Sequence, residues 1–290
     1  MRRQCARIAL LALLLCVAPA IAQRDPRNDP TWVRSGAPDD PAELFPRSSP
    51  LLAPFKADPM EFRSGVRIFD SSLTKTSVIA TAVGVRPVMY EWTLNPEMRA
   101  QLIVCAVGLG RYDLQHSVDQ ICEDWHYGFL WATRYEAWSY GLFVGHISSH
   151  LGDETIERTG EKRVNYVMEE VAGYGSFDFN RKTRLYYGAG YAFSQAHVDA
   201  PWRLQLGCEH YLEERTVTGG LGPYVALDVQ ARQEASWTPG AQLVLGFALP
   251  GSVPDHTLDL QLVAASGTTA AREFFRSGET YLGIAFAVDL

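Results

Sequence analysis

Short segments in which large apolar residues alternate with small or polar ones recur through most of this 290-residue chain. The closing segment has two distinct faces, formed by Leu282, Ile284, Phe286, Val288 and Leu290 on one side and Gly283, Ala285, Ala287 and Asp289 on the other. Successive side chains of a β-strand point to opposite faces, so each such segment predicts a strand with one apolar face. This period of two constrains the chain to an all-β fold.

The length of the segments distinguishes two all-β alternatives, a soluble sandwich and a transmembrane barrel. Most segments contain about 9 to 13 residues, which matches tilted strands that cross a membrane and exceeds the usual strand length of about five or six. Aromatic residues such as Trp138, Trp202 and Tyr281 gather toward segment ends, where membrane interfaces would lie. The barrel is therefore the favoured prediction, and the sandwich is the alternative.

We predict a transmembrane, antiparallel, up-and-down β-barrel of about twelve strands. Their expected ranges are 63–69, 77–91, 100–112, 119–134, 137–149, 163–177, 181–194, 202–213, 221–232, 240–249, 257–265 and 280–290. An even number of strands places both ends of the barrel on the periplasmic side. The longer connections, 150–162 and 266–279, then both fall on the outer side.

The chain divides into three predicted regions. Residues 1–22 combine three arginines, an apolar run and a small-residue cleavage site at Ala20-Ile21-Ala22, which is typical of a secretory signal peptide. Residues 23–60 hold eight of the 16 prolines and predict an extended segment, in the periplasm or inside the barrel. Residues 61–290 form the predicted outer-membrane barrel.

Removal of the signal peptide makes the chain more acidic. The loss of its three arginines lowers the formal net charge from −7 to −10. An exported chain this acidic is not expected to bind nucleic acid, because it cannot neutralise phosphates. Cys105, Cys122 and Cys208 remain, which allows one disulfide and leaves at least one thiol over. Their spacing matches no zinc site, and we expect no metal and no cofactor.

A polar cluster begins at the outer end of the fifth predicted strand. The alternation of that strand continues its apolar face onto His146 and Ser148, which predicts that both side chains face lipid near the outer leaflet. A His and a Ser two residues apart on one strand face lie close enough for the imidazole to accept the hydroxyl proton. Ser148 is therefore the candidate nucleophile and His146 the candidate base.

A polar strand end that enters an extracellular loop is the favoured interpretation of this cluster, ahead of catalysis. In that interpretation His146 and His150 lie at headgroup depth and Asp153 and Glu154 are solvated. Separately, Ser149, His150, Asp153 and Glu154 are the candidate binding residues of the cluster. A metal site formed by His146, His150, Asp153 or Glu154 is a third alternative.

The inward-facing charges of the predicted strands are mixed in sign. Such a series favours internal ion pairs over a selective channel, and twelve strands enclose only a narrow interior. Glu169 and Glu170 place one carboxylate on each face of the sixth strand, and we expect the inward one to pair with an arginine such as Arg184.

The His-x-Ser arrangement of His146 and Ser148 resembles that of outer-membrane phospholipase A and the lipid A 3-O-deacylase, barrel hydrolases whose sites face the lipid. The resemblance implies a third catalytic residue, a Glu or an Asn on the neighbouring strand opposite the Ser. Glu161 and Asn165 are the candidates for that role.

Longer stretches resemble a bacterial family of outer-membrane barrels known as domain of unknown function 1207 (DUF 1207). They are Leu44-Phe45-Pro46, Leu51-Leu52-Ala53-Pro54, Ala57-Asp58-Pro59, Ser148-Ser149-His150-Leu151-Gly152-Asp153-Glu154, Arg163-Val164-Asn165, Ala226-Leu227-Asp228-Val229-Gln230-Ala231-Arg232 and Tyr281-Leu282-Gly283. This resemblance implies a barrel in the outer membrane and implies no reaction.

Three functions therefore stay open. A structural or binding barrel is the favoured hypothesis. A hydrolase of outer-leaflet lipids, of the phospholipase or lipid A deacylase type, is the alternative, and a narrow channel or lipid transporter is the second alternative. The expected location is the outer membrane of a Gram-negative cell, and the expected partners are its lipids, lipopolysaccharide and the barrel-assembly machinery.

Overall fold

The computed structural model describes residues 42–46, 48–95, 98–197, 199–212, 222–250 and 257–289. The predicted signal peptide, residues 1–22, lies outside the described residues, as do residues 23–41 of the proline-rich segment. Among the described residues, no helix is long and apolar enough to span a membrane.

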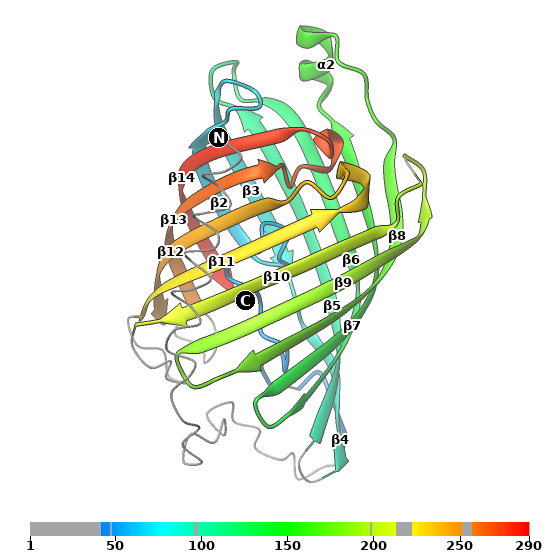
Figure 1. Cartoon of the computed structure of the whole chain (residues 1–290), viewed down its shortest axis with the longest axis vertical. Coiled ribbons are helices and arrows are strands. Elements are labelled where there is room, and N and C mark those ends of the chain that lie inside the picture. The colour runs from blue at the N-terminus through cyan, green and yellow to red at the C-terminus, as the bar shows by residue number, and fades with distance from the viewer. Residues whose placement is uncertain are drawn as a thin grey trace.

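Twelve antiparallel strands form a closed barrel (Figure 1). In order around the wall they are β2 (Ser64–Asp70), β3 (Ser77–Val85), β5 (Met98–Asp113), β6 (Asp119–Tyr135), β7 (Trp138–Leu151), β8 (Tyr166–Asp178), β9 (Thr183–Gln195), β10 (Trp202–Tyr211), β11 (Gly222–Arg232), β12 (Gly240–Pro250), β13 (Thr257–Thr268) and β14 (Gly278–Asp289). The last strand pairs with the first, with Ile284 opposite Ile68, so the wall has no open edge. The predicted all-β barrel of about twelve strands is confirmed.

The second predicted strand differs from the expected range 77–91, because it is broken at Arg86-Pro87. Its first part, β3, pairs with the C-terminal half of β5, and its second part, β4 (Val88–Asn95), pairs with the N-terminal half. A proline has no N–H to donate to the ladder, which accounts for the break. A short strand, β1 (Ala42–Leu44), adds to the free side of β4.

Large apolar side chains point away from the barrel axis. On β14, Leu282 is 63% exposed and Ile284 is 71% exposed, whereas the alternate residue Ala285 is buried. Charged residues occupy the inner face instead, and the carboxylates of Glu209 and Asp259 are fully buried. A soluble sandwich would bury its large apolar residues, so the distribution corresponds to a barrel with a lipid-facing exterior.

Small inward-facing residues make room for large ones inside the wall. Gly207 lies beside Tyr186 and Gly246 beside Tyr224, and a methyl group on either glycine would overlap the neighbouring tyrosine ring. The absence of a side chain at these positions allows the tyrosines to lie across the strands and fill the interior.

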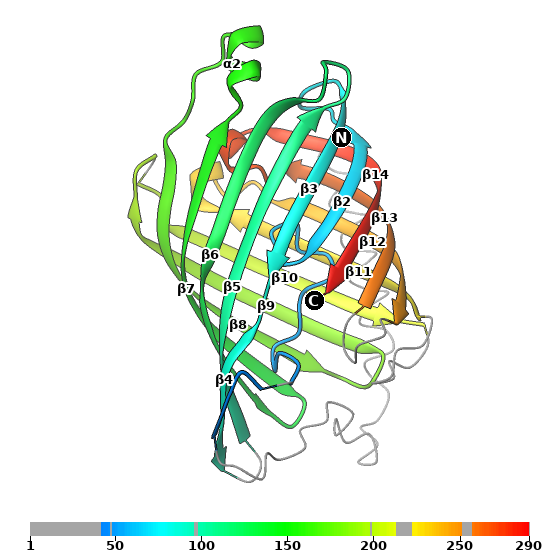
Figure 2. The same ribbon diagram turned by 180° about the vertical axis from the view of Figure 1, so that it is seen from behind.

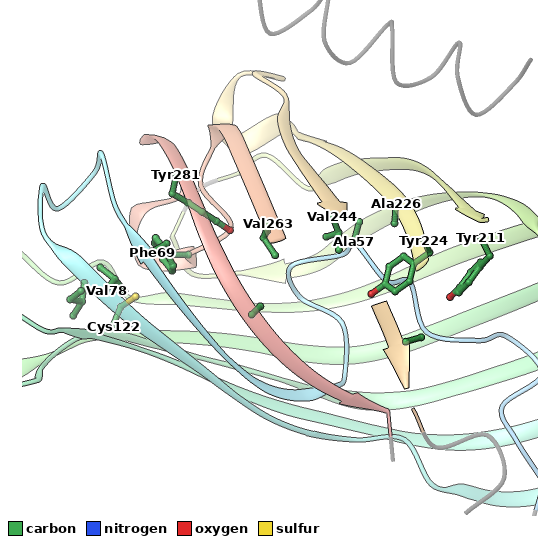
Figure 3. Packing of buried hydrophobic residues seen from close by; sticks show 14 residues of the cluster. Ala57, Phe69, Val78, Cys122, Tyr211, Tyr224, Ala226, Val244, Val263 and Tyr281 are labelled. Carbon is green, nitrogen blue, oxygen red and sulfur yellow. The ribbon is translucent and has the colours of Figure 1, made fainter. Parts of the chain in front are cut away.

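Residues 48–63, here called the inner segment, lie inside the barrel, where Figure 2 shows them as a blue trace behind the front strands. Leu52 and Phe55 are 2% and 4% exposed. The Phe55 ring stacks on Tyr186 with the centroids 4.0 Å apart. Ala57 belongs to the buried apolar cluster drawn in Figure 3, together with Val244. The structure thus places this part of the proline-rich region in the lumen, the second of the two expected locations.

The connection between β13 and β14 folds across the outer mouth of the barrel, at the end that carries α2 (Asp153–Thr159). We call residues 269–277, which include the short helix η3 (Arg272–Phe274), the outer lid. The backbone N–H of Arg272 donates to both carboxylate oxygens of Asp124 on β6, at 3.2 and 3.3 Å. The lid therefore spans from β14 to the opposite wall.

A buried carboxylate beneath the lid joins several outer connections. Glu234, in the short helix η2 (Gln233–Ala235), accepts hydrogen bonds from the Tyr166 hydroxyl at 3.0 Å and from His197 Nε2 at 2.7 Å. Burial by itself raises the pKa of Glu234, but the His197 hydrogen bond and the charges of Arg272 and Arg232 outweigh it, so the pKa lies below its usual range.

Candidate functional site

The candidate residues His146 and Ser148 lie on the outward face of β7. Their alternation continues the exposed positions Leu142 and Val144, while Ile147 between them points inward and is 1% exposed. The His146 side chain is 20% exposed. Both candidate residues therefore belong to the surface that faces lipid in a membrane barrel.

Glu169 on the neighbouring strand binds His146. In the β7–β8 ladder His146 is directly opposite Glu169, and His146 Nδ1 lies 2.7 Å from Glu169 Oε1. A carboxylate oxygen accepts this hydrogen bond, so in a neutral imidazole Nδ1 carries the proton and Nε2 holds the free lone pair. This orientation is the one that a histidine needs to act as a base toward a second group.

Neither of the two residues that the sequence suggested for the third position lies directly opposite His146. Glu161 and Asn165 lie in the connection between α2 and β8, ahead of the first β8 residue, Tyr166. Tyr166 is opposite Ser149, and the residue opposite His146 comes three positions later in β8. Glu161 and Asn165, which precede Tyr166, are therefore not opposite His146. His146 instead donates its hydrogen bond to Glu169, which lies further along β8.

A β-bulge accompanies the two adjacent glutamates of β8. In the β8–β9 ladder Glu169 pairs with Ser194 and Glu170 pairs with Ala192, so Phe193 has no partner. A bulge increases the local twist of a strand and changes the direction of nearby side chains. Here it lies directly beside the carboxylate that binds His146.

Glu170 points into the lumen and binds Arg203. The Arg203 guanidinium holds the carboxylate with two hydrogen bonds, of 2.7 Å from Nε and 2.8 Å from Nη2. The expected pairing of the inward glutamate with a lumenal arginine is confirmed, but the partner is Arg203, because Arg184, the example given, binds Glu209 at 2.7 Å. This bidentate ion pair links β8 to β10 on the inside of the barrel.

Aromatic side chains of β6 border the outward pair. Tyr127 is opposite His146, with their rings 4.9 Å apart between centroids, and Trp125 is opposite Ser148. Further from the end of the barrel that carries α2, the next lipid-facing residues are Phe129 on β6 and Val144 on β7, and both are exposed. The candidate pair therefore stands at the boundary between an aromatic band and an apolar wall.

The four candidate binding residues do not converge on one point. The Ser149 hydroxyl points inward and donates to Asp124, whereas His150 is exposed on the outward face. Asp153 accepts a hydrogen bond of 2.7 Å from Arg163, and Glu154 is exposed in the first turn of α2. In the described part of the chain, no group of three or more His, Cys, Asp and Glu side chains is placed to hold a metal ion.

The closed wall, the apolar exterior and the charged interior define the fold of the outer-membrane β-barrel proteins. The chain belongs to the family described as "Protein of unknown function (DUF1207)", which matches residues 41–289. No curated protein matches the sequence.

Solved outer-membrane barrels resemble the structure. The Salmonella typhi outer membrane phospholipase (OMPLA) dimer with bound calcium gives a TM-score of 0.53 at 12% identity, over 82% of this chain and 95% of that chain. Outer membrane phospholipase A from Escherichia coli gives a TM-score of 0.51 at 12% identity, over 82% of this chain and 93% of that chain. At these identities the likeness demonstrates a shared fold.

Proposed function

We propose that this protein is a lipid acyl hydrolase of the outer membrane, with Ser148 as nucleophile, His146 as general base and Glu169 as the residue that orients the imidazole. The observation that carries the proposal is the 2.7 Å hydrogen bond between His146 Nδ1 and Glu169 on the outward face. A buried ion pair inside the barrel would serve stability alone, whereas this pair faces the surface that meets acyl chains.

The proposed chemistry follows from the free lone pair of His146 Nε2. Ser148 is two residues along the same face, about 7 Å by strand spacing, and rotation of the Ser148 side chain alone, with His146 held by Glu169, would bring its hydroxyl toward Nε2. Nε2 takes the hydroxyl proton while Oγ attacks the ester carbonyl, and the same proton then passes to the departing alcohol. Water, activated by Nε2, releases the fatty acid and restores Ser148.

The surroundings of the pair support an acyl ester as substrate. Phe129 and Val144 continue the outward face toward the membrane centre and are 57% and 47% exposed. An acyl chain lying along these side chains would bring its ester bond to the level of His146 and Ser148. The activity named for the two structural neighbours, phospholipid hydrolysis, belongs to the same reaction class.

A structural or binding barrel is the competing hypothesis, and one observation favours it. The inner segment fills much of the lumen. The Arg184 guanidinium, for example, donates hydrogen bonds to the carbonyls of Ala53 and Pro54 and also binds the Glu209 carboxylate. A barrel of this kind has a rigid, occupied interior that needs no reaction to explain it. Signal-peptide removal, outer-membrane insertion, and contacts with lipopolysaccharide and the barrel-assembly machinery remain predictions under either hypothesis.

Mass spectrometry of cellular lipids distinguishes the two hypotheses. Wild type and Ser148→Ala are expressed at equal levels in a Gram-negative host, and phospholipids and lipid A are quantified. We expect free fatty acid and deacylated lipid with wild type and none with S148A. Ser266→Ala is the matched control, because Ser266 lies on β13 and is bonded to Thr280 on β14, away from the site.

Covalent labelling gives an independent measurement on the purified protein. An alkyl sulfonyl fluoride should modify wild type and S266A but not S148A, because only an activated serine displaces fluoride at a useful rate. Identical lipid profiles for all three proteins, together with no labelling, would reject the hydrolase and leave the structural barrel.

A further inference from the structure

Side chains hold the inner segment against the barrel wall, without any strand pairing to it. Residues 48–63 contain no strand, and their backbone groups bond mainly to side chains. The N–H of Lys56 donates to Glu209 at 2.8 Å, and the carbonyl of Ala57 accepts from Gln242 at 2.9 Å. Asp58 accepts from Gln205 at 2.8 Å. These are separate side-chain contacts with different strands of the wall, so no continuous strand ladder holds the inner segment.

Four charged groups fasten the inner segment at the end of the barrel opposite α2. Lys56 Nζ lies 2.8 Å from Asp259 and 2.6 Å from Asp289, and the Arg63 guanidinium binds the same two carboxylates. We call Lys56, Arg63, Asp259 and Asp289 the charge latch. Asp259 and Asp289 lie on the adjacent strands β13 and β14, so the latch ties the inner segment to one part of the wall.

Cavities separate the inner segment from the wall above the latch. One, of about 100 Å³, is bordered by Met60 and Arg63 on one side and by Arg67 and Arg111 of the wall on the other, and it extends to Ala271 of the outer lid. A second cavity, of about 40 Å³, lies between Met60 and the wall on another side of the segment. Both are large enough to hold water, so the packing around the segment is incomplete.

Displacement of the inner segment would change the charge of the wall. Asp259 and Asp289 would lose Lys56 and Arg63, and Arg86 would lose Glu61, which it binds at 3.0 Å. The two freed carboxylates are adjacent at the end of the barrel opposite α2. The wall arginines Arg67 and Arg86 lie apart from them, Arg67 opposite Ala285 and Arg86 on the connection between β3 and β4. A carboxylate pair at a narrow entrance favours cations over anions.

We propose that the barrel contains a closed pathway for small hydrophilic cations, with the inner segment as its stopper and the outer lid as its second closure. The latch keeps the stopper in place, and the hydrogen bonds of Arg272 with Asp124 keep the lid across the mouth. This pathway is separate from the outward face of β7 and does not depend on the proposed hydrolase.

Current measurements in planar bilayers test the proposal with the full chain. The proteins are wild type, the latch variant Lys56→Gln/Arg63→Gln, a lid variant in which residues 270–276 are replaced by two glycines, and the combination of latch and lid variants. We expect stepwise currents at least about tenfold more frequent in the combination than in wild type, because removal of one side of a buried ion pair is strongly destabilising. Arg134→Gln is the control, since it breaks the bridge with Asp178 and leaves the inner segment bound.

The ion preference is a second outcome of the same experiment. In a potassium chloride gradient the combined latch and lid variant should conduct potassium in preference to chloride. A second combined variant keeps the lid change but carries Asp259→Asn/Asp289→Asn in place of Lys56→Gln/Arg63→Gln. This second variant should show no such preference. Correctly inserted proteins without current, or currents that favour chloride, would overturn the proposal.

Thiol labelling keeps the proposal testable if the double latch variant fails to assemble. Met60→Cys combined with the milder single substitution Lys56→Gln places a thiol beside both cavities in a chain whose latch keeps Arg63 but carries one net negative charge. We expect a cationic methanethiosulfonate reagent to label it several times faster than an anionic reagent of equal size. The parent protein, whose Cys105, Cys122 and Cys208 are buried, measures the background. Equal rates for the two reagents, or no labelling by either, would contradict a cation pathway.

Discussion

His146 on β7 donates a 2.7 Å hydrogen bond from Nδ1 to Glu169 on β8, and the two residues are directly opposite in the ladder. The bond fixes the tautomer of the imidazole and leaves Nε2 available on the outward face. Its partner Glu169 is 41% exposed, so the pair is open to the membrane side instead of being part of the buried interior. This pair is the feature on which the proposed hydrolase depends.

Glu169→Gln should reduce lipid hydrolysis by about 10²- to 10⁴-fold with little change in KM, because the amide orients the imidazole incorrectly and cannot stabilise its charged form. The measurement is kcat and KM with a phospholipid ester in detergent micelles. Glu154→Gln is the control, since Glu154 is exposed in α2. Equal kcat in wild type and E169Q would remove Glu169 from the mechanism.

Arg203→Met should destabilise the barrel by about 3–5 kcal/mol, because it leaves the carboxylate of Glu170 buried without its partner. Urea unfolding in detergent or lipid measures the change. The double variant Arg203→Met/Glu170→Met should recover most of the loss, since both charges are removed together. A double variant as unstable as R203M would show that the cost comes from packing.

Gly207→Ala should destabilise the barrel by about 1–3 kcal/mol, because its methyl group overlaps the Tyr186 ring. Tyr186→Leu in the same chain should recover part of the loss by removing the overlapping atoms. Gly173→Ala is the matched control, since no atom lies within 4 Å of the added methyl group. Heat-modifiable gel mobility and urea unfolding report the result, and equal effects of G207A and G173A would contradict the packing argument.

Acid should loosen the outer lid through Glu234. The folded-state pKa of Glu234 lies below its usual value of 4.5, so the carboxylate contributes stability above that value. This contribution falls as the pH drops below 4.5 and through the lower folded-state pKa. The expected result is faster proteolysis or hydrogen exchange of residues 269–277 at acid pH.

Glu234→Gln tests the assignment of this acid response. The variant should expose the lid at neutral pH, because Arg232 and Arg272 lose their counter-charge, and the further effect of acid should shrink. A variant with the same acid response as wild type would assign the transition to another group.

The alternation of residues was sufficient to predict the barrel, its strand number and the face that each strand turns outward. A period of two is local, so Leu282 and Ile284 indicate an outward apolar face before any neighbour is known. The same alternation placed His146 and Ser148 together on one face. The predicted strand 77–91 ran across Arg86-Pro87, and only the structure showed that it divides into two strands that pair with different halves of β5.

The partners of these residues depended on the tertiary structure. Which residue lies opposite His146 is set by the length of the connection 152–165 and by the register of β8, and neither follows from a local pattern. For that reason Glu161 and Asn165 were plausible from the sequence and Glu169 was found only in the ladder. The pairing of Glu170 with Arg203 likewise requires the position of β10.

The inner segment shows most clearly which features followed from the sequence and which required the tertiary structure. Its prolines excluded regular strand and helix, and that local constraint held equally for a segment in the periplasm and for one in the lumen. Contacts distant in sequence decided between them, above all Lys56 and Arg63 with Asp259 and Asp289, because a buried charge is stable only where the closed wall supplies its counter-charge. The sequence by itself determined which side chains of each strand face outward, and the closed barrel determined which segment and which ion pairs lie inside it.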